Sequence, residues 1–107
     1  MKIETAVSEG KDSLLAGLCA ALLTAKSADE MCGLLADLCT PAEIRTMAER
    51  WQVARLLDAT ELSYREIHEA TGVSTTTIVR VARFLRQEPH QGYRRALDRV
   101  RESGDAG

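Results

Sequence analysis

The chain has 107 residues and a mass of 11.7 kDa, enough for one domain with a single core but too little for two. Apolar residues make up 45% of it and charged residues 28%, a balance that excludes disordered, collagen-like and membrane-embedded classes. The longest nearly apolar run, residues 14–25, is short of the ~20 residues of a membrane span. Acidic residues precede that run, where a secretory leader would be basic, so we expect a cytoplasmic protein.

The numbers of cysteine and asparagine residues limit the kinds of site that the chain can form. The three cysteines, Cys19, Cys32 and Cys39, are an odd number and form no C-x-x-C pair, so the sequence implies neither a disulfide framework nor a zinc site. We expect reduced thiols in the core. The chain has no asparagine, and it therefore lacks one of the two side chains that usually read adenine bidentately.

The net charge of −2 conceals an asymmetry along the chain. Residues 1–61 carry 6 basic and 10 acidic side chains, whereas residues 62–101 carry 8 arginines and 4 acidic residues. Every cation of this second segment is arginine, whose planar guanidinium matches phosphate and guanine edges. The C-terminal part is therefore suited to an anionic partner, although a solvated helix face would carry similar charges.

The sequence pattern is helical throughout. No stretch alternates with the period of a strand, and both prolines and most glycines lie where helices would begin or end, so we predict an all-α chain. We expect residues 1–10 to form a flexible arm and residues 102–107 a flexible tail. Between them we predict a single helical domain over residues 11–101, whose first helix covers about residues 11–25.

Capping signals open the next two helices. Ser27 and Glu30 form a capping box. Thr40, Pro41 and Glu43 supply an N-cap, a proline at the first helical position and a closing acid, and this helix should run to about residue 58. Its apolar positions are Ile44, Met47, Ala48, Trp51, Val53, Ala54, Leu56 and Leu57. They exceed what a surface helix of a small monomer buries, which favours an interleaved homodimer over a central helix buried by its own chain.

A two-helix unit is predicted over residues 63–86. Ser63 and Glu66 form a capping box that opens a helix over residues 64–70, Gly72 ends it, and Ser74 caps a second helix over residues 75–86. The apolar residues that would hold the two helices at an angle are Ile67, Ala70, Val73, Ile78, Val81, Ala82 and Leu85. This pattern is typical of a helix-turn-helix.

Three consecutive threonines, residues 75–77, begin the second helix although threonine is a poor helix former. Contact with nucleic acid would explain them, because a recognition helix meets base edges through its N-terminal turn and threonine offers a hydroxyl and a methyl group. Arg65, His68 and Arg86 would then reach phosphates. The alternative is that these residues only cap the helix.

From about residue 34 to residue 100, the chain resembles the Trp repressor superfamily and, within it, the YerC/YecD-type branch. The residues that carry the resemblance are the run 38–43 (LCTPAE), the helix residues 47–50 (MAER) and 53–57 (VARLL), the unit 63–67 (SYREI) with 71–78 (TGVSTTTI), and Gly92-Tyr93. The resemblance implies an intertwined all-helical dimer that binds double-stranded operator DNA as a transcriptional repressor, with one recognition helix in each half-site.

The resemblance also implies site residues. The DNA contacts fall on Tyr64, Arg65, His68, Ser74, Thr75, Thr76, Thr77, Val79 and Arg83. The effector pocket of the family maps onto Thr40, Arg50 and Arg80, and paired guanidinium groups can sandwich an indole and bind its carboxylate. However, Val81 stands where tryptophan-binding members have glycine, and Phe84 where they have serine. Either side chain can fill the slot, so we expect no cofactor, with L-tryptophan or another amino-acid corepressor as the alternative.

Two other classes of function compete with DNA binding. An enzyme is disfavoured, because the chain has no nucleophile elbow, zinc-protease, P-loop or dinucleotide motif. The alternative is a protein-interaction module that docks on a partner in the transcription machinery. For this module the final apolar stripe, Tyr93, Ala96, Leu97 and Val100, would bind a partner helix. The same stripe could instead close the homodimer, which we favour.

Overall fold

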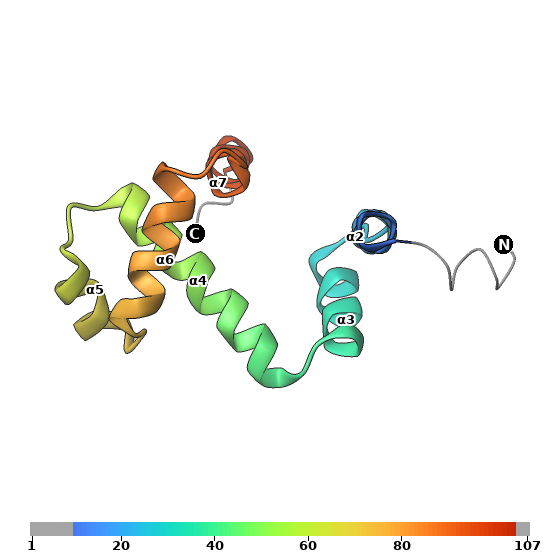
Figure 1. Ribbon diagram of the computed structural model, residues 1–107, viewed down its shortest axis with the longest axis horizontal. Helices are drawn as coiled ribbons and strands as arrows, with labels where there is room; N and C mark the ends of the chain where they lie inside the picture. Colours follow the sequence, from blue (N-terminus) through green and yellow to red (C-terminus); the bar gives the residue numbers. More distant parts are fainter. Residues whose placement is uncertain (1–9, 105–107) are drawn as a thin grey trace, which may run out of the picture. The chain divides into compact units, whose positions relative to one another are not determined.

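The computed structural model describes residues 10–104 and shows an all-helical chain in that range (Figure 1). Its helices are α2 (Lys11–Leu22), α3 (Ala28–Leu38), α4 (Pro41–Ala59), α5 (Tyr64–Thr71), α6 (Thr75–Arg86) and α7 (Gly92–Glu102). The all-α prediction is therefore confirmed. Of the predicted arm and tail, residues 1–9 and 105–107 lie outside the described residues.

Contacts within the chain divide it into two compact units, and the boundary along the sequence falls between Ile44 and Arg45, early in α4. The first unit contains α2 and α3, and the second contains most of α4 together with α5, α6 and α7. The single domain predicted over residues 11–101 therefore stays a prediction about the assembled protein.

The first helix ends earlier than the sequence predicts. α2 stops at Leu22 rather than near residue 25, because the backbone turns there and the Thr24 hydroxyl donates to the carbonyl of Ala21 at 2.7 Å. Ser27 caps α3 as predicted, accepting from the Glu30 N–H at 3.1 Å. The Glu30 carboxylate accepts from the N–H of Lys26 at 2.9 Å, one residue before the expected partner.

Within one chain, no described residue of the first unit is buried. Cys19 and Cys32 are exposed and Cys39 is half-buried, all three as free thiols. The expectation that they lie in the core is therefore wrong for the single chain. The reason is that α2 and α3 have apolar side chains on exposed faces, with no second layer of this unit to cover them.

The predicted start of α4 is confirmed. The Thr40 hydroxyl accepts from the Glu43 N–H at 3.1 Å, and the Glu43 carboxylate accepts from the Thr40 N–H at 2.8 Å. The backbone hydrogen bond from Thr40 lowers the pKa of Glu43 below its usual value. The helix runs to Ala59, one residue beyond the predicted end.

The second unit has a continuous apolar core. Its buried members are Val53, Ala54, Leu57, Ile67, Val73, Ile78, Val81, Ala82, Leu85 and Leu97. They come from α4, α5, the turn after α5, α6 and α7, and α6 packs against both α5 and α7 (Figure 1). One predicted member, Ala70, is exposed instead, because α5 is only two turns long and directs Ile67 alone into the core.

The helix-turn-helix prediction is confirmed in its local details. Ser63 and Glu66 form both bonds of the capping box, at 3.1 and 2.9 Å, and the bond from the Ser63 backbone lowers the pKa of Glu66. Gly72 ends α5 in the left-handed conformation, with φ of 76°. At the same turn, His68 Nδ1 donates to the carbonyl of Val73 at 2.7 Å, which fixes the approach of the chain to α6.

Replacing Gly72 tests whether the turn depends on this backbone conformation. A Cβ atom there would meet no atom within 4 Å, so the cost of Gly72→Ala comes from the left-handed φ and should be about 1 kcal/mol of unfolding free energy. Gly72→Asn should cost less, because asparagine tolerates this conformation. Urea unfolding of the three proteins measures the order. Equal stability of the glycine and alanine proteins would contradict the assignment.

Candidate nucleic-acid interface

One face of α6 is turned away from the core. The buried residues of the helix are Ile78, Val81, Ala82 and Leu85. Five other residues of the helix are exposed: Thr75, Thr76, Val79, Arg80 and Arg83. The helical period places these five residues together on one side. The burial pattern thus leaves this side of the helix open to solvent.

Ser74 and Thr77 have a structural role at the start of α6. The Ser74 hydroxyl accepts from the Thr77 N–H at 3.2 Å and donates to the Thr77 hydroxyl at 3.0 Å. Capping therefore accounts for these two residues, as the alternative interpretation of the threonine run had it. Thr75 and Thr76 form no side-chain hydrogen bond with any described residue, which leaves both hydroxyl groups available at the exposed first turn.

Two arginines among the predicted DNA contacts, Arg65 and Arg83, each have an acidic neighbour. Arg65 Nε lies 3.1 Å from Glu69 Oε1 with 88% of its side chain exposed, and Arg83 Nε lies 3.4 Å from Glu88 Oε2. Exposed ion pairs of this kind contribute about 0–1 kcal/mol. A phosphate group can therefore replace either carboxylate at little cost.

Tyr64 and His68 lie on α5 and are exposed. Because Nδ1 of His68 donates to Val73, the neutral ring presents Nε2 as an acceptor. Only the protonated ring would donate from Nε2 to a phosphate. Arg86, which the sequence analysis assigned to phosphate binding, donates to the carbonyl of Leu57 at 3.4 Å and so links α6 to the end of α4.

The three residues of the predicted effector pocket each have a different environment. Thr40 caps α4, and Nε of Arg50 is buried without a hydrogen-bond partner among the described residues. The guanidinium of Arg80 lies over the ring of Phe84, 4.4 Å from its centroid. The other neighbour of that ring is His90, whose ring is nearly parallel at 6.0 Å.

Asp58 links the end of α4 to α7. Arg94 donates to both of its carboxylate oxygens, at 2.7 and 3.1 Å, and Arg101 donates to Oδ2. The hydrogen bond from Arg94 is the main reason why the pKa of Asp58 lies below its usual value, and burial opposes this shift. Beside this network, Trp51 stacks on Tyr93 with ring centroids 6.5 Å apart. These contacts fix α7 against α4.

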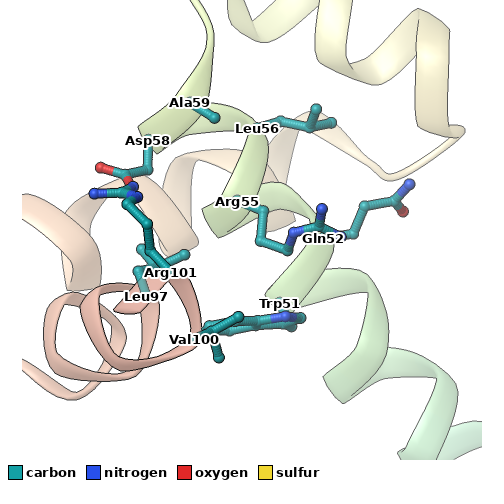
Figure 2. A pocket seen from close by; sticks show the side chains of 9 residues that line it. All are labelled: Trp51, Gln52, Arg55, Leu56, Asp58, Ala59, Leu97, Val100 and Arg101. Atoms are coloured by element: carbon teal, nitrogen blue, oxygen red, sulfur yellow. The ribbon is translucent and has the colours of Figure 1, made fainter. Parts of the chain in front are cut away.

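An open cavity of about 220 Å³ lies between α4 and α7 (Figure 2). Its lining combines apolar side chains with a polar margin: Trp51, Leu56, Ala59, Leu97 and Val100, and Gln52, Arg55, Asp58 and Arg101. No local sequence pattern predicts this cavity, because it depends on the packing of two helices that lie far apart in the sequence.

Among residues 10–104, no helix has both the length and the apolar character needed to cross a membrane. Nor do three or more histidine, cysteine or acidic side chains gather there in a group able to hold a metal ion.

An all-helical chain with a short helix, a tight glycine turn and an exposed second helix defines the helix-turn-helix class. The family model described as "Trp repressor protein" matches residues 13–101, and the chain belongs to this family. The predicted resemblance is thus confirmed.

Known relatives agree with this assignment. The uncharacterized protein YerC of Bacillus subtilis (strain 168) is 42% identical over 82 residues, which cover 77% of each protein. A TrpR-like protein from Eubacterium eligens ATCC 27750 has a similar structure, with a TM-score of 0.77, 37% identity and coverage of 84% of this chain and 91% of the other. A Trp repressor candidate from Staphylococcus aureus also gives a TM-score of 0.77, with 35% identity over 94% and 95% of the two chains.

Asp58→Asn should reduce stability in a pH-dependent way. The Asp58 side chain is 14% exposed, and we expect a loss of about 1 kcal/mol at pH 7, because a neutral amide accepts weaker hydrogen bonds from Arg94. A carboxyl group whose folded pKa is lowered stabilises the fold above its unfolded pKa and loses this contribution as the pH falls through the folded pKa. The two unfolding free energies should therefore begin to converge below about pH 5 and continue to converge as the pH falls through the folded pKa.

Thermal or urea unfolding across this pH range measures the difference. The control is Asp37→Asn, which removes a carboxylate from α3, outside the network. A constant difference between wild type and Asp58→Asn down to pH 3 would contradict the role of the ionised carboxylate.

Proposed function

We propose that this protein is a sequence-specific regulator of transcription that binds double-stranded DNA as a homodimer and acts as a repressor. The observation that carries the proposal is the two-sidedness of α6, whose inner face is buried and whose outer face presents threonine, valine and arginine side chains. A helix presented in this way by a preceding short helix fits the major groove of DNA. Membership of the Trp repressor family supports the same function.

The first unit supports a dimer. α2 and α3 have 12 and 11 residues and no buried side chain within one chain, and isolated helices of this length are marginal in water. Their exposed leucines include Leu14 and Leu15, each 59% exposed, and Leu23, 84% exposed. A second copy of the chain would cover these apolar faces, and the cavity between α4 and α7 offers such a copy an apolar surface.

We further propose that no tryptophan is needed for DNA binding. The ring of Phe84 already lies against the guanidinium of Arg80 and forms a cation–π interaction with it. Val81 is fully buried. These contacts support a role for Arg80 in holding the recognition helix or binding DNA, and the same role is proposed for Arg50.

The phosphate contacts should make DNA binding strongly dependent on salt. Raising the salt concentration from about 50 to 200 mM should weaken binding by orders of magnitude, because bound phosphates release counterions. Arg65→Ala should weaken binding to all duplexes alike and lower the salt slope by about two, one contact for each subunit. Thr76→Ala should change the preferred sequence instead. Fluorescence anisotropy with selected and random duplexes measures both effects.

Lys26→Ala is the matched control, since it removes one cation at the start of α3 and outside the helix-turn-helix. It should leave affinity and slope nearly unchanged. If the wild-type protein binds no duplex, the DNA-binding proposal is wrong and the protein-interaction module is favoured. Equal losses on selected and random DNA for both Arg65→Ala and Thr76→Ala would contradict the assigned roles.

Calorimetric titration with L-tryptophan tests the second proposal. We expect no binding in the micromolar range, because the resemblance implies that Phe84 and Val81 replace smaller residues beside the indole. Micromolar binding that disappears in the Arg50→Ala variant would instead show that the effector pocket is functional.

A further inference from the structure

The outer face of α6 has an unusual composition for a surface that reads bases. The helix contains no asparagine, glutamine, lysine, aspartate or glutamate. It therefore lacks the amides that pair with adenine and the carboxylates that accept from cytosine. Arginine is the one side chain of the helix that could make a bidentate contact to a base.

The two arginines of this face, Arg80 and Arg83, both contact neighbouring side chains. Arg80 lies over Phe84, and Arg83 lies near the same ring, at 5.9 Å, while its Nε contacts Glu88. Residues near the N-terminus of a recognition helix are the ones that reach base edges. The exposed side chains that precede Arg80 on α6 are those of Thr75, Thr76 and Val79, and all three carry methyl groups.

Val79 is the exception to the burial pattern of this helix. Its side chain is 54% exposed, whereas Ile78 and Val81, which lie on the inner side of the helix, are fully buried. Thr75 and Thr76 precede it by four and three residues, so the three side chains are neighbours on one face. Together, Thr75, Thr76 and Val79 form a methyl surface at the centre of the exposed side of α6.

We propose that the methyl surface recognises the C5 methyl group of thymine, so that each half-site of the preferred DNA contains thymine opposite Val79. The inference rests on the proposed function and makes it more specific. The C5 methyl group is the apolar group that the bases present in the major groove. Contact with it removes exposed apolar area from water on both sides, which explains an exposed valine among polar residues.

Replacing thymine by uracil tests this directly, because the two bases differ only in the methyl group. A random duplex pool is enriched for sequences that the wild-type dimer binds, and the enriched duplex is then synthesised with deoxyuridine at each thymidine in turn. At one position of each half-site, the wild type should bind the uracil duplex roughly fourfold more weakly, the factor for one buried methyl-sized group. Uracil in both half-sites should weaken binding about fifteenfold, because the two effects multiply.

Val79→Ala should abolish this preference for thymine while binding the uracil duplex about as well as the wild type does. Thr76→Ser, which removes a methyl group and keeps the hydroxyl, is a second probe and should reduce a thymine preference at a neighbouring position. Leu62→Ala shortens an exposed apolar side chain outside α6 and should keep the full preference. Circular dichroism verifies that each variant is folded.

The outcomes distinguish a failure of the proposed DNA binding from a failure of thymine recognition alone. If the wild-type dimer enriches no sequence, the proposed function and this inference both fail. If it binds the enriched duplex but tolerates uracil throughout, or if Val79→Ala keeps the thymine preference, the inference alone is overturned. A change in subunit association on Val79→Ala, without a change in thymine preference, would also overturn it by placing Val79 in a subunit contact.

Discussion

The buried contact of α5 and α6 against α4 determines how the helix-turn-helix is presented to solvent. Val53, Ile67, Ile78 and Val81 are fully inaccessible to solvent, and burying each side chain of this size contributes about 1.5–3 kcal/mol. These residues set the angle between the two short helices. Because α6 directs its apolar side inward, its polar side has to face outward, and the candidate DNA interface follows from the packing.

Arginine has two different roles in the second unit. Arg86, Arg94 and Arg101 bind acceptors on α4, namely the carbonyl of Leu57 and the carboxylate of Asp58. Arg65 is almost fully exposed beside Glu69. The excess of positive charge in residues 62–101 therefore does not translate directly into a DNA-binding surface. Arg65, Arg80 and Arg83 are exposed on α5 and α6, whereas Arg95 and Arg99 are exposed on α7.

The sequence was most informative where structure depends on neighbours in the chain. The caps at Ser63, Thr40 and Ser74 and the turn at Gly72 follow from side chains within three residues of one another, and all are present. Ala70 was wrongly placed in the core, because burial depends on how far α5 extends over α4 and α6. Arg86 to Leu57 and Arg94 to Asp58 join residues 29 and 36 positions apart, and no local pattern indicates such pairs. The exposed cysteines depend on what covers α2 and α3, which one chain does not contain.

In the proposed complex, a dimer presents two α6 helices to successive major grooves. Hydroxyl-radical footprinting of the wild-type protein on its selected duplex tests this most directly. We expect two protected patches of equal size on one side of the DNA, related by a two-fold axis, with centres about 34 Å apart. A single protected patch, or protection without two-fold symmetry, would contradict the claim.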